Sequence, residues 1–204
     1  MSQDFVYLAS GSPRRRELLQ QIGVSFRVVG MAVDEAVLPD EGPSAYVTRL
    51  AAAKAAAGWE RSRDFTHVPV LAADTAVVLD GQILGKPADG QDAEGMLRRL
   101  SGRTHEVLTA IALRTANGLQ SRISRSEVTF RSIAAAEARA YWETGEPSDK
   151  AGAYAIQGRG AIFIADLRGS YSGVMGLPLF ETAELLREAG LVLLGPHAGK
   201  LDEH

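Results

Sequence analysis

Segments typical of strands and of helices alternate along almost the whole chain, and this alternation constrains the fold more than any other feature. Short apolar runs at Phe5–Ala9, Ser25–Val29 and Val68–Ala73 read as strands. The spacing of apolar residues predicts helices over Pro13–Ile22 and Ser44–Ala57. Because strands and helices alternate, the sequence favours an α/β fold in which helices cover the faces of a sheet.

The remainder of the chain adds antiparallel strands to this pattern. Asp80-Gly81 marks a hairpin turn, and residues 106–113 and 120–131 form a longer antiparallel pair around Asn117-Gly118. The other expected elements are an apolar strand at Ala161–Ile164 and helices that follow Asp89 and span Ala134–Thr144 and Leu179–Ala189. We expect a single domain over residues 1–195, with two lobes around a cleft, and a loose tail at 196–204.

Composition excludes several classes of protein. The 204 residues are 46% hydrophobic and carry a net charge of −3, which argues against a nucleic-acid partner bound by phosphate neutralisation. The absence of cysteine excludes disulfides and thiolate metal sites, and it is compatible with a reducing cytoplasm. No apolar run approaches the roughly 18 residues that span a bilayer. We expect a cytoplasmic protein that does not insert into a membrane.

The first strand runs into a turn that has the features of a phosphate site. Ser10-Gly11-Ser12 precedes Pro13 at the first helical position, and we expect the Ser12 hydroxyl to cap the helix. Arg14, Arg15 and Arg16 follow, where the helix dipole disfavours cations. Free amides and guanidinium groups together suit a bound phosphate. The alternative is a basic first turn that is simply solvated.

Carboxylates and lysines elsewhere suit the same chemistry. Asp74 follows the apolar run Val70–Ala73, at the expected end of a strand, where it is either a functional acid or a turn former. With the Asp34-Glu35 pair it would offer the oxygen ligands that Mg²⁺ or Mn²⁺ prefers. Lys54 lies on the inward face of an alanine-rich helix, and Lys86 follows a strand in Gly85-Lys86-Pro87. The alternatives are a snorkelling Lys54 and a solvated acidic loop.

Other enzyme classes find less support. The chain has no Gly-x-Ser-x-Gly elbow, P-loop or dinucleotide-binding glycine fingerprint, and its four scattered histidines suggest no zinc site. We expect His105 to make a structural hydrogen bond. Residue types and spacing alone therefore predict a phosphate-ester or nucleotide hydrolase that works by positioning and electrostatics.

The chain also resembles the Maf family of nucleoside triphosphate pyrophosphatases, also called septum-formation-inhibitor proteins. The resemblance runs from Leu8 to about Gly190 through seven ordered blocks: LASGSPRRRELL, the Asp34-Glu35 pair, RLAAAKA, ADTAVVLDGQILGKP, LSGRTHEVLTAIAL, GEPSDKAGAYAIQGRG and GSYSGVMGLPL. It implies an elongated mixed sheet with flanking helices and a cleft between two lobes, similar to inosine-triphosphate pyrophosphatases, and often a homodimer. It also implies hydrolysis of a nucleoside triphosphate to monophosphate and pyrophosphate with a divalent metal.

The resemblance assigns roles to individual residues. Asp74 matches the catalytic proton acceptor, and Glu35, Lys54 and Lys86 match catalytic positions in the cleft, with Glu35 and Asp74 as the expected metal ligands. The phosphate-binding turn corresponds to Ser10, Ser12, Arg14 and Arg15, and positions linked to substrate choice correspond to Arg14, Thr75 and Gln157.

The Asp74-Thr75 pair and the loop ending in Gln157 look like the branch that acts on dTTP and UTP. The Gln157 amide offers a donor and an acceptor to the pyrimidine edge, although it could instead merely organise its loop. Two alternatives remain: a non-catalytic regulator of cell division that acts through protein interaction, and a house-cleaning hydrolase of modified pyrimidine nucleotides.

Overall fold

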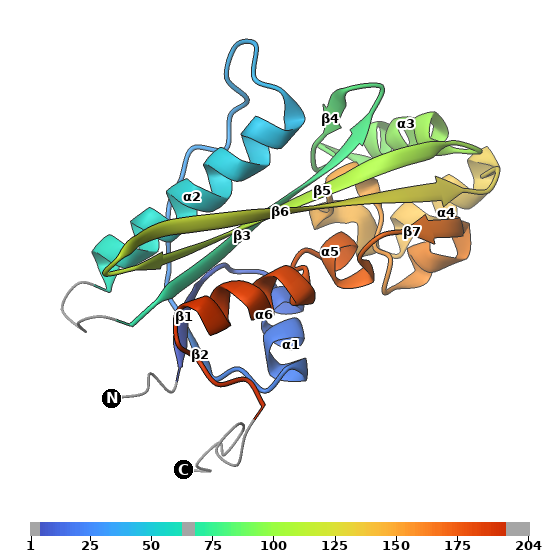
Figure 1. The fold of residues 1–204 in the computed structure, drawn as a ribbon. Coiled ribbons are helices and arrows are strands. Elements are labelled where there is room, and N and C mark those ends of the chain that lie inside the picture. Colours follow the sequence, from blue (N-terminus) through green and yellow to red (C-terminus); the bar gives the residue numbers. More distant parts are fainter. Residues whose placement is uncertain (1–4, 63–67, 195–204) are drawn as a thin grey trace.

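The computed structural model describes residues 5–62 and 68–194, which form a mixed α/β structure (Figure 1). Its strands are β1 (Val6–Ala9), β2 (Phe26–Val28), β3 (Val70–Leu79), β4 (Gln82–Leu84), β5 (Thr104–Thr115), β6 (Gly118–Phe130) and β7 (Ile164–Arg168). Its α-helices are α1 (Pro13–Gln21), α2 (Pro43–Arg61), α3 (Gly90–Leu100), α4 (Ala135–Glu143), α5 (Tyr171–Met175) and α6 (Leu179–Glu188). Short 3-10 helices η2 (Glu146–Asp149), η3 (Ala151–Ala153) and η4 (Arg159–Phe163) precede β7.

The seven strands of this described part form one sheet in the order β2-β1-β3-β5-β6-β7, with β4 beside β3. Strand β1 pairs in parallel with β2 and β3, and the other pairs are antiparallel. The mixed sheet with flanking helices confirms the fold class expected from the sequence.

Alternation along β3 distributes its side chains between the two faces of the sheet. Val70 and Ala72 face α2 in one apolar cluster, and Leu71 and Ala73 face α1 and α6 in another. Further along the same strand, Val77 packs with α3 and α4 in a third cluster. On the face opposite α2, two separate clusters therefore cover the two ends of the long strands (Figure 1).

The edge of β3 is uncovered between these two ends. The pairing with β1 stops at Ala9 opposite Ala72, and the pairing with β4 starts at Val77 opposite Leu84. Neither strand pairs with residues 73–76 of β3, while β5 continues along the other side of β3. This gap places Asp74 and Thr75 at an open edge, with their side chains on opposite faces.

The structure corrects the prediction that Asp74 stands at the end of a strand. The strand expected at Val68–Ala73 runs on as far as Leu79 in β3, and Asp74 lies near the middle of β3. The cause is the continuous antiparallel ladder with β5, which carries the backbone through the polar pair Asp74-Thr75. The open edge beside Asp74 therefore results from the end of β1, and not from an end of β3.

The apolar segment Ala161–Ile164 was also expected to be a strand, and this prediction is wrong for most of it. Residues 159–163 form η4, and β7 begins at Ile164. A short apolar run shows no periodicity that would distinguish a strand from a helical turn. Strand β6 pairs with this segment only from Ile164 onward.

The loose tail predicted at 196–204 lies outside the described residues. Within residues 5–62 and 68–194, none of the helices combines the length and hydropathy needed to span a bilayer.

Candidate active site

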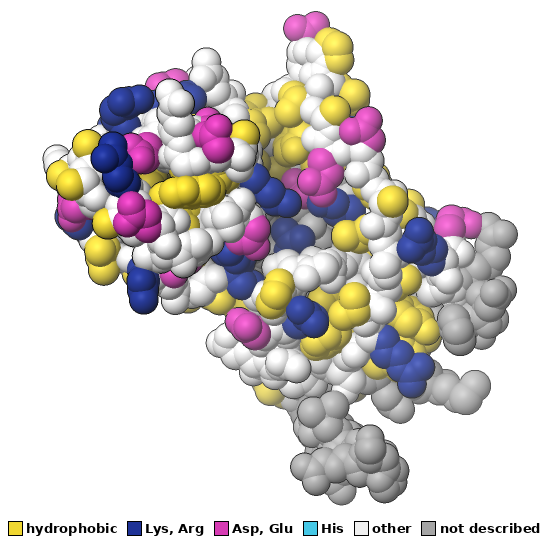
Figure 2. Space-filling view, turned by 180° about the vertical axis from the view of Figure 1, so that it is seen from behind, with side chains coloured by type: hydrophobic (Ala, Val, Ile, Leu, Met, Phe, Trp, Pro, Cys, Tyr) yellow, Lys and Arg dark blue, Asp and Glu magenta, His cyan; other side chains and the backbone are white. Residues whose placement is uncertain are grey.

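A cavity of about 550 Å³ opens at the gap in the edge of β3, between the two groups of helices. Figure 2 shows lysine and arginine side chains gathered in this hollow. The cavity brings together all ten residues predicted from the sequence: Ser10, Ser12, Arg14, Arg15, Glu35, Lys54, Asp74, Thr75, Lys86 and Gln157. Its volume is in the range of pockets that enclose a small-molecule ligand.

Lys54 joins the two acidic residues of the site. Its ammonium lies 2.7 Å from Oδ1 of Asp74 and 2.5 Å from Oε1 of Glu35. The Lys54 side chain is 7% exposed and that of Asp74 is 10% exposed, whereas Glu35 is 50% exposed. The Val47-Leu50-Ala51 stripe of α2 turns Lys54 inward, as the helical spacing predicted. Lys54 therefore does not snorkel to the surface.

The two carboxylates have pKa values displaced in opposite directions. Burial raises the pKa of Asp74, and the charge and hydrogen bond of Lys54 offset only part of that effect. For Glu35, burial acts in the same sense, but the hydrogen bond and charge of Lys54, with the charge of Lys86, bring the pKa below its ordinary value. A carboxyl with a raised pKa is the better proton acceptor of the two.

Helix α2 also holds the loop that carries Glu35. The hydroxyl of Tyr46 donates to the backbone carbonyl of Glu35 at 3.1 Å. Arg49 donates to the carbonyl of Ala36 at 2.9 Å while its guanidinium pairs with Glu41. One helix therefore positions both Lys54 and the more exposed carboxylate.

Ser10 anchors the turn before α1, and its hydroxyl oxygen accepts two hydrogen bonds. One comes from the amide of Ser12 and the other from Nη1 of Arg15, each at 3.2 Å. Because both bonds use the oxygen as acceptor, the O–H proton of Ser10 remains as a donor, and the buried Ser10 lines the cavity. Such a donor suits a phosphate oxygen.

Ser12 occupies the N-cap position of α1, as predicted, but its side chain makes no capping hydrogen bond, so the expected hydroxyl cap is wrong. Pro13 lacks an N–H, and the Ser12 amide turns back to Ser10 instead. The first turn of α1 thus keeps its remaining amides at the wall of the cavity.

Arg15 makes a chain of hydrogen bonds that runs through Thr75. Its Nη2 donates to Oγ1 of Thr75 at 3.2 Å, and its Nε donates to the carbonyl of Gly176 at 2.8 Å. The hydroxyls of Thr75 and Thr109 lie 2.9 Å apart, and that of Thr109 donates to the carbonyl of Gly173 at 2.7 Å. Since Thr109 spends its proton on Gly173, Thr75 donates to Thr109. These hydrogen bonds therefore orient Arg15 and Thr75, which both line the cavity.

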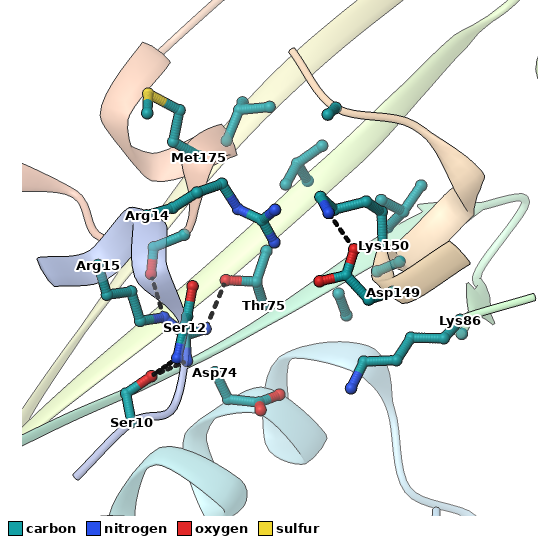
Figure 3. Close-up of a pocket in the computed structure, with 18 of the residues that line it drawn as sticks. Ser10, Ser12, Arg14, Arg15, Asp74, Thr75, Lys86, Asp149, Lys150 and Met175 are labelled. Carbon is teal, nitrogen blue, oxygen red and sulfur yellow. Dashed lines mark hydrogen bonds and ion pairs between the residues drawn. The ribbon is translucent and has the colours of Figure 1, made fainter. Parts of the chain in front are cut away.

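Further cations enter the cavity from several directions, as Figure 3 shows for Arg14, Lys86 and Lys150. Arg14 comes from the first turn of α1, Lys86 from the connection after β4, and Lys150 from the loop between η2 and η3. Lys150 pairs with the neighbouring Asp149. Neither Lys150 nor Thr109 was predicted from the sequence to be a site residue. Thr109 could have been found only from its position opposite Thr75, and that position is known only once the pairing of β3 with β5 is known.

His105 has the structural role expected of it. Its Nε2 lies 2.8 Å from the hydroxyl of Tyr154, and its ring packs edge-on against Phe130. Burial lowers the pKa of His105 to about 4. The ring is therefore neutral at physiological pH and belongs to the core of the α3–α4 lobe.

The donor set of the site fits Mg²⁺ or Mn²⁺. Within residues 5–62 and 68–194, no group of three or more His, Cys, Asp or Glu residues forms a metal site. However, Mg²⁺ is commonly held by one or two carboxylates, with waters and substrate phosphates as the other ligands. Glu35 and Asp74 supply two carboxylates that share one ammonium, beside a cavity rich in cations.

Comparison with known proteins gives matches over nearly the whole chain. The family model described as "Maf-like protein" matches residues 5–189. A dTTP/UTP pyrophosphatase of Aromatoleum aromaticum is 54% identical over 92% of this chain and 97% of its own length. One of Methylococcus capsulatus is 56% identical over 90% of each chain. The solved structure of the Staphylococcus aureus Ham1 protein matches 64% of this chain and 72% of its own, at 15% identity and a TM-score of 0.40.

Proposed function

The chain belongs to the Maf-like protein family, and from this membership and the site we propose that it is a nucleoside triphosphate pyrophosphatase acting on dTTP and UTP. Relatives more than half identical to it carry the name dTTP/UTP pyrophosphatase, and the match extends over about nine tenths of both chains. The reaction releases the nucleoside monophosphate and pyrophosphate.

One observation supports the reaction chemistry most strongly. A buried carboxylate, Asp74, with a raised pKa lies at an open sheet edge, held by Lys54 and faced by further cations of the same cavity. A proton acceptor beside an array of cations is the equipment for attack on a polyphosphate. The regulator alternative offers no reason for this arrangement.

In the proposed mechanism, Asp74 accepts a proton from a water molecule that attacks the α-phosphorus. The bond between the α-phosphorus and its bridging oxygen breaks, and pyrophosphate leaves. Lys86, Arg14 and Lys150 are placed to neutralise charge on the α-phosphate and on the leaving group. Ser10 donates its hydroxyl proton to a phosphate oxygen. Lys54 keeps Asp74 ionised and oriented.

We further propose that Glu35 and Asp74 hold Mg²⁺ or Mn²⁺ when substrate is bound. The ion would supply charge stabilisation to the phosphate oxygens. Lys54, which now bridges the two carboxylates, sets the position of both. We propose that the Gln157 amide hydrogen-bonds to the pyrimidine edge, and that Arg14 and Thr75 are the other residues that affect substrate choice.

Several finer proposals accompany this activity. Modified pyrimidine nucleotides are substrates compatible with the same site, which would make the enzyme a house-cleaning hydrolase. The chain without cysteine is compatible with the cytoplasm as its compartment. We also propose that the protein forms a homodimer. We propose no nucleic-acid partner, because the net charge of −3 does not favour binding to nucleic acid.

Product analysis tests the proposal directly. Purified protein is incubated with a panel of nucleoside triphosphates and deoxynucleoside triphosphates, with Mg²⁺ or Mn²⁺. We expect pyrophosphate and monophosphate first from dTTP and UTP, and no turnover after EDTA treatment. Orthophosphate as the product would show that a different phosphorus is attacked. No turnover of the standard nucleotides or of 5-methyl-UTP and pseudo-UTP would favour the regulator.

A further inference from the structure

The loop that carries Gln157 is held from behind by two side chains of the α4–η2 region, Tyr141 and Glu146. The Tyr141 hydroxyl donates to Oε1 of Glu146 at 2.6 Å and accepts from the amide of Ala155 at 3.1 Å. The same Glu146 carboxylate accepts from the amides of Arg159 and Gly160, at 2.9 and 3.1 Å. Both ends of segment 155–160 are therefore fastened to one hydroxyl–carboxylate pair.

The segment fits closely around this pair. A Cβ atom on Gly158 would collide with the Glu146 carboxylate, and one on Gly160 would lie 2.6 Å from the Tyr141 hydroxyl oxygen. Tyr141 is 4% exposed and packs in the apolar cluster of α3 and α4. The glycines let the backbone approach a support that is itself rigid.

Between the two fastened ends, the chain faces the cavity. Ala155, Ile156 and Gln157 line it, whereas neither Tyr141 nor Glu146 does. Gln157 is exposed and makes no hydrogen bond to the rest of the described chain that would fix its amide. The place of the amide is therefore set by the backbone, and the backbone is set by Tyr141 and Glu146.

From this arrangement we propose that Glu146 and Tyr141 are positioning residues for base recognition: they hold the Ala155–Gly160 loop so that Gln157 meets the pyrimidine. This inference rests on the proposed function. Neither residue touches the reacting atoms. Loss of either side chain loosens the Ala155–Gly160 loop, so that Gln157 is no longer held in place to bind the base. Asp74, Lys54 and the cations that face the phosphates are not altered.

The test compares wild type, E146Q and Y141F. Each variant keeps most of the side-chain volume and removes part of the hydrogen bonding by which Tyr141 and Glu146 hold the loop. We expect the ratio of kcat/KM for dTTP to that for dATP to fall about tenfold in both variants, mainly through a higher KM for dTTP. The kcat for dTTP changes less than about threefold, because the catalytic groups are intact.

E137Q is the matched control. Glu137 pairs with Arg131 and accepts from the amide of Ala134, so its change also removes a carboxylate with a charged and a backbone partner in the same lobe. Glu137 does not line the cavity. We expect E137Q to keep the wild-type substrate ratio even where its thermal stability falls.

Hydrogen exchange separates this inference from the proposed function. We expect the amides of Arg159 and Gly160 to exchange at least about tenfold faster in E146Q than in wild type. Unchanged substrate ratios in E146Q and Y141F would overturn the inference and leave the proposed function standing. Equal hydrolysis of dTTP and dATP by wild type would refute the proposed substrate. The exchange rates alone would then test whether Glu146 and Tyr141 hold the Ala155–Gly160 loop, and unchanged rates would overturn that inference.

Discussion

The Lys54 ammonium lies 2.7 Å from the Asp74 carboxylate, in a contact between the inward face of α2 and the open edge of β3. Breaking a buried pair leaves one charge without compensation, which costs several kcal/mol. This contact therefore ties the proposed proton acceptor to the stability of the sheet edge as well as to its ionisation.

Asp74→Asn removes the proposed proton acceptor and keeps its size. We expect kcat for dTTP to fall by about 10²–10⁴-fold, because the attacking water loses its base. Asp80→Asn is the control, since Asp80 lies in the turn after the same strand and asparagine tolerates its positive φ of 51°. Steady-state kinetics and thermal melts measure both variants. Near-wild-type turnover in D74N with an unchanged fold would refute the assignment.

The pH dependence of catalysis tests the link between Lys54 and Asp74. Burial raises the pKa of Asp74 and Lys54 lowers it, so the acid limb of kcat/KM lies above the ordinary Asp pKa in wild type. Lys54→Met removes the opposing charge, and we expect the limb to move to higher pH because Asp74 must be ionised to act. Lys86→Met is the comparison: it weakens substrate binding, and its acid limb stays in place. A limb that does not move in K54M would exclude Asp74 as the titrating group.

Thr109→Val tests the chain of hydrogen bonds from Arg15 to Gly173. The variant removes the hydroxyl that donates to the Gly173 carbonyl, which still accepts from the amide of Gly176, and it leaves Thr75 without its acceptor. We expect a loss of about 1–3 kcal/mol in the free energy of unfolding, together with a higher KM for dTTP. Thr104→Val is the matched control. Thr104 lies on the same strand as Thr109 and its hydroxyl bonds that of Thr129 on β6, but Thr104 is exposed. Equal stability losses in the two variants, measured by urea denaturation, would contradict the prediction.

His105 makes the stability of the fold depend on pH. Burial lowers its pKa from 6.5 to about 4 in the folded protein. Because the folded pKa is lowered, its contribution to stability is fully present above pH 6.5 and is lost as the pH falls toward 4. Over this window we expect His105 to account for at most about 3 kcal/mol. His105→Asn cannot titrate there, so its free energy of unfolding should fall less steeply. Parallel curves for the two proteins would rule out His105 as the source.

The sequence located the chemistry of the site well. Strand and helix periods predicted the mixed α/β class, and the inward face of α2 placed Lys54 correctly. All ten residues named as candidates line one cavity. Their assigned roles remain predictions that the experiments above address. The sequence could not locate Thr109 or Glu146, because a buried threonine or a loop glutamate has no local pattern that reveals its partner.

The sequence misjudged the use of one residue and left a long-range contact of another hidden. Ser12 sits at the N-cap without capping, because its amide turns back to Ser10. Arg15 lines the cavity as expected, and its guanidinium also bonds the Gly176 carbonyl, 161 positions away. A motif gives the type and order of side chains but not the acceptors that reach them from distant segments.

What the sequence by itself determined was the kind of most local elements and the kinds of group available: short apolar strands, an alanine-rich helix with an inward lysine, and an unusual concentration of arginines after a serine turn. These follow from periods and propensities within about a dozen residues. The tertiary structure alone decided that β3 runs on past the end of β1, which opens the edge at Asp74. It also decided which cations stay free for a substrate and which are committed to the protein, because hydrogen bonds and ion pairs form between segments that only the folded sheet brings together.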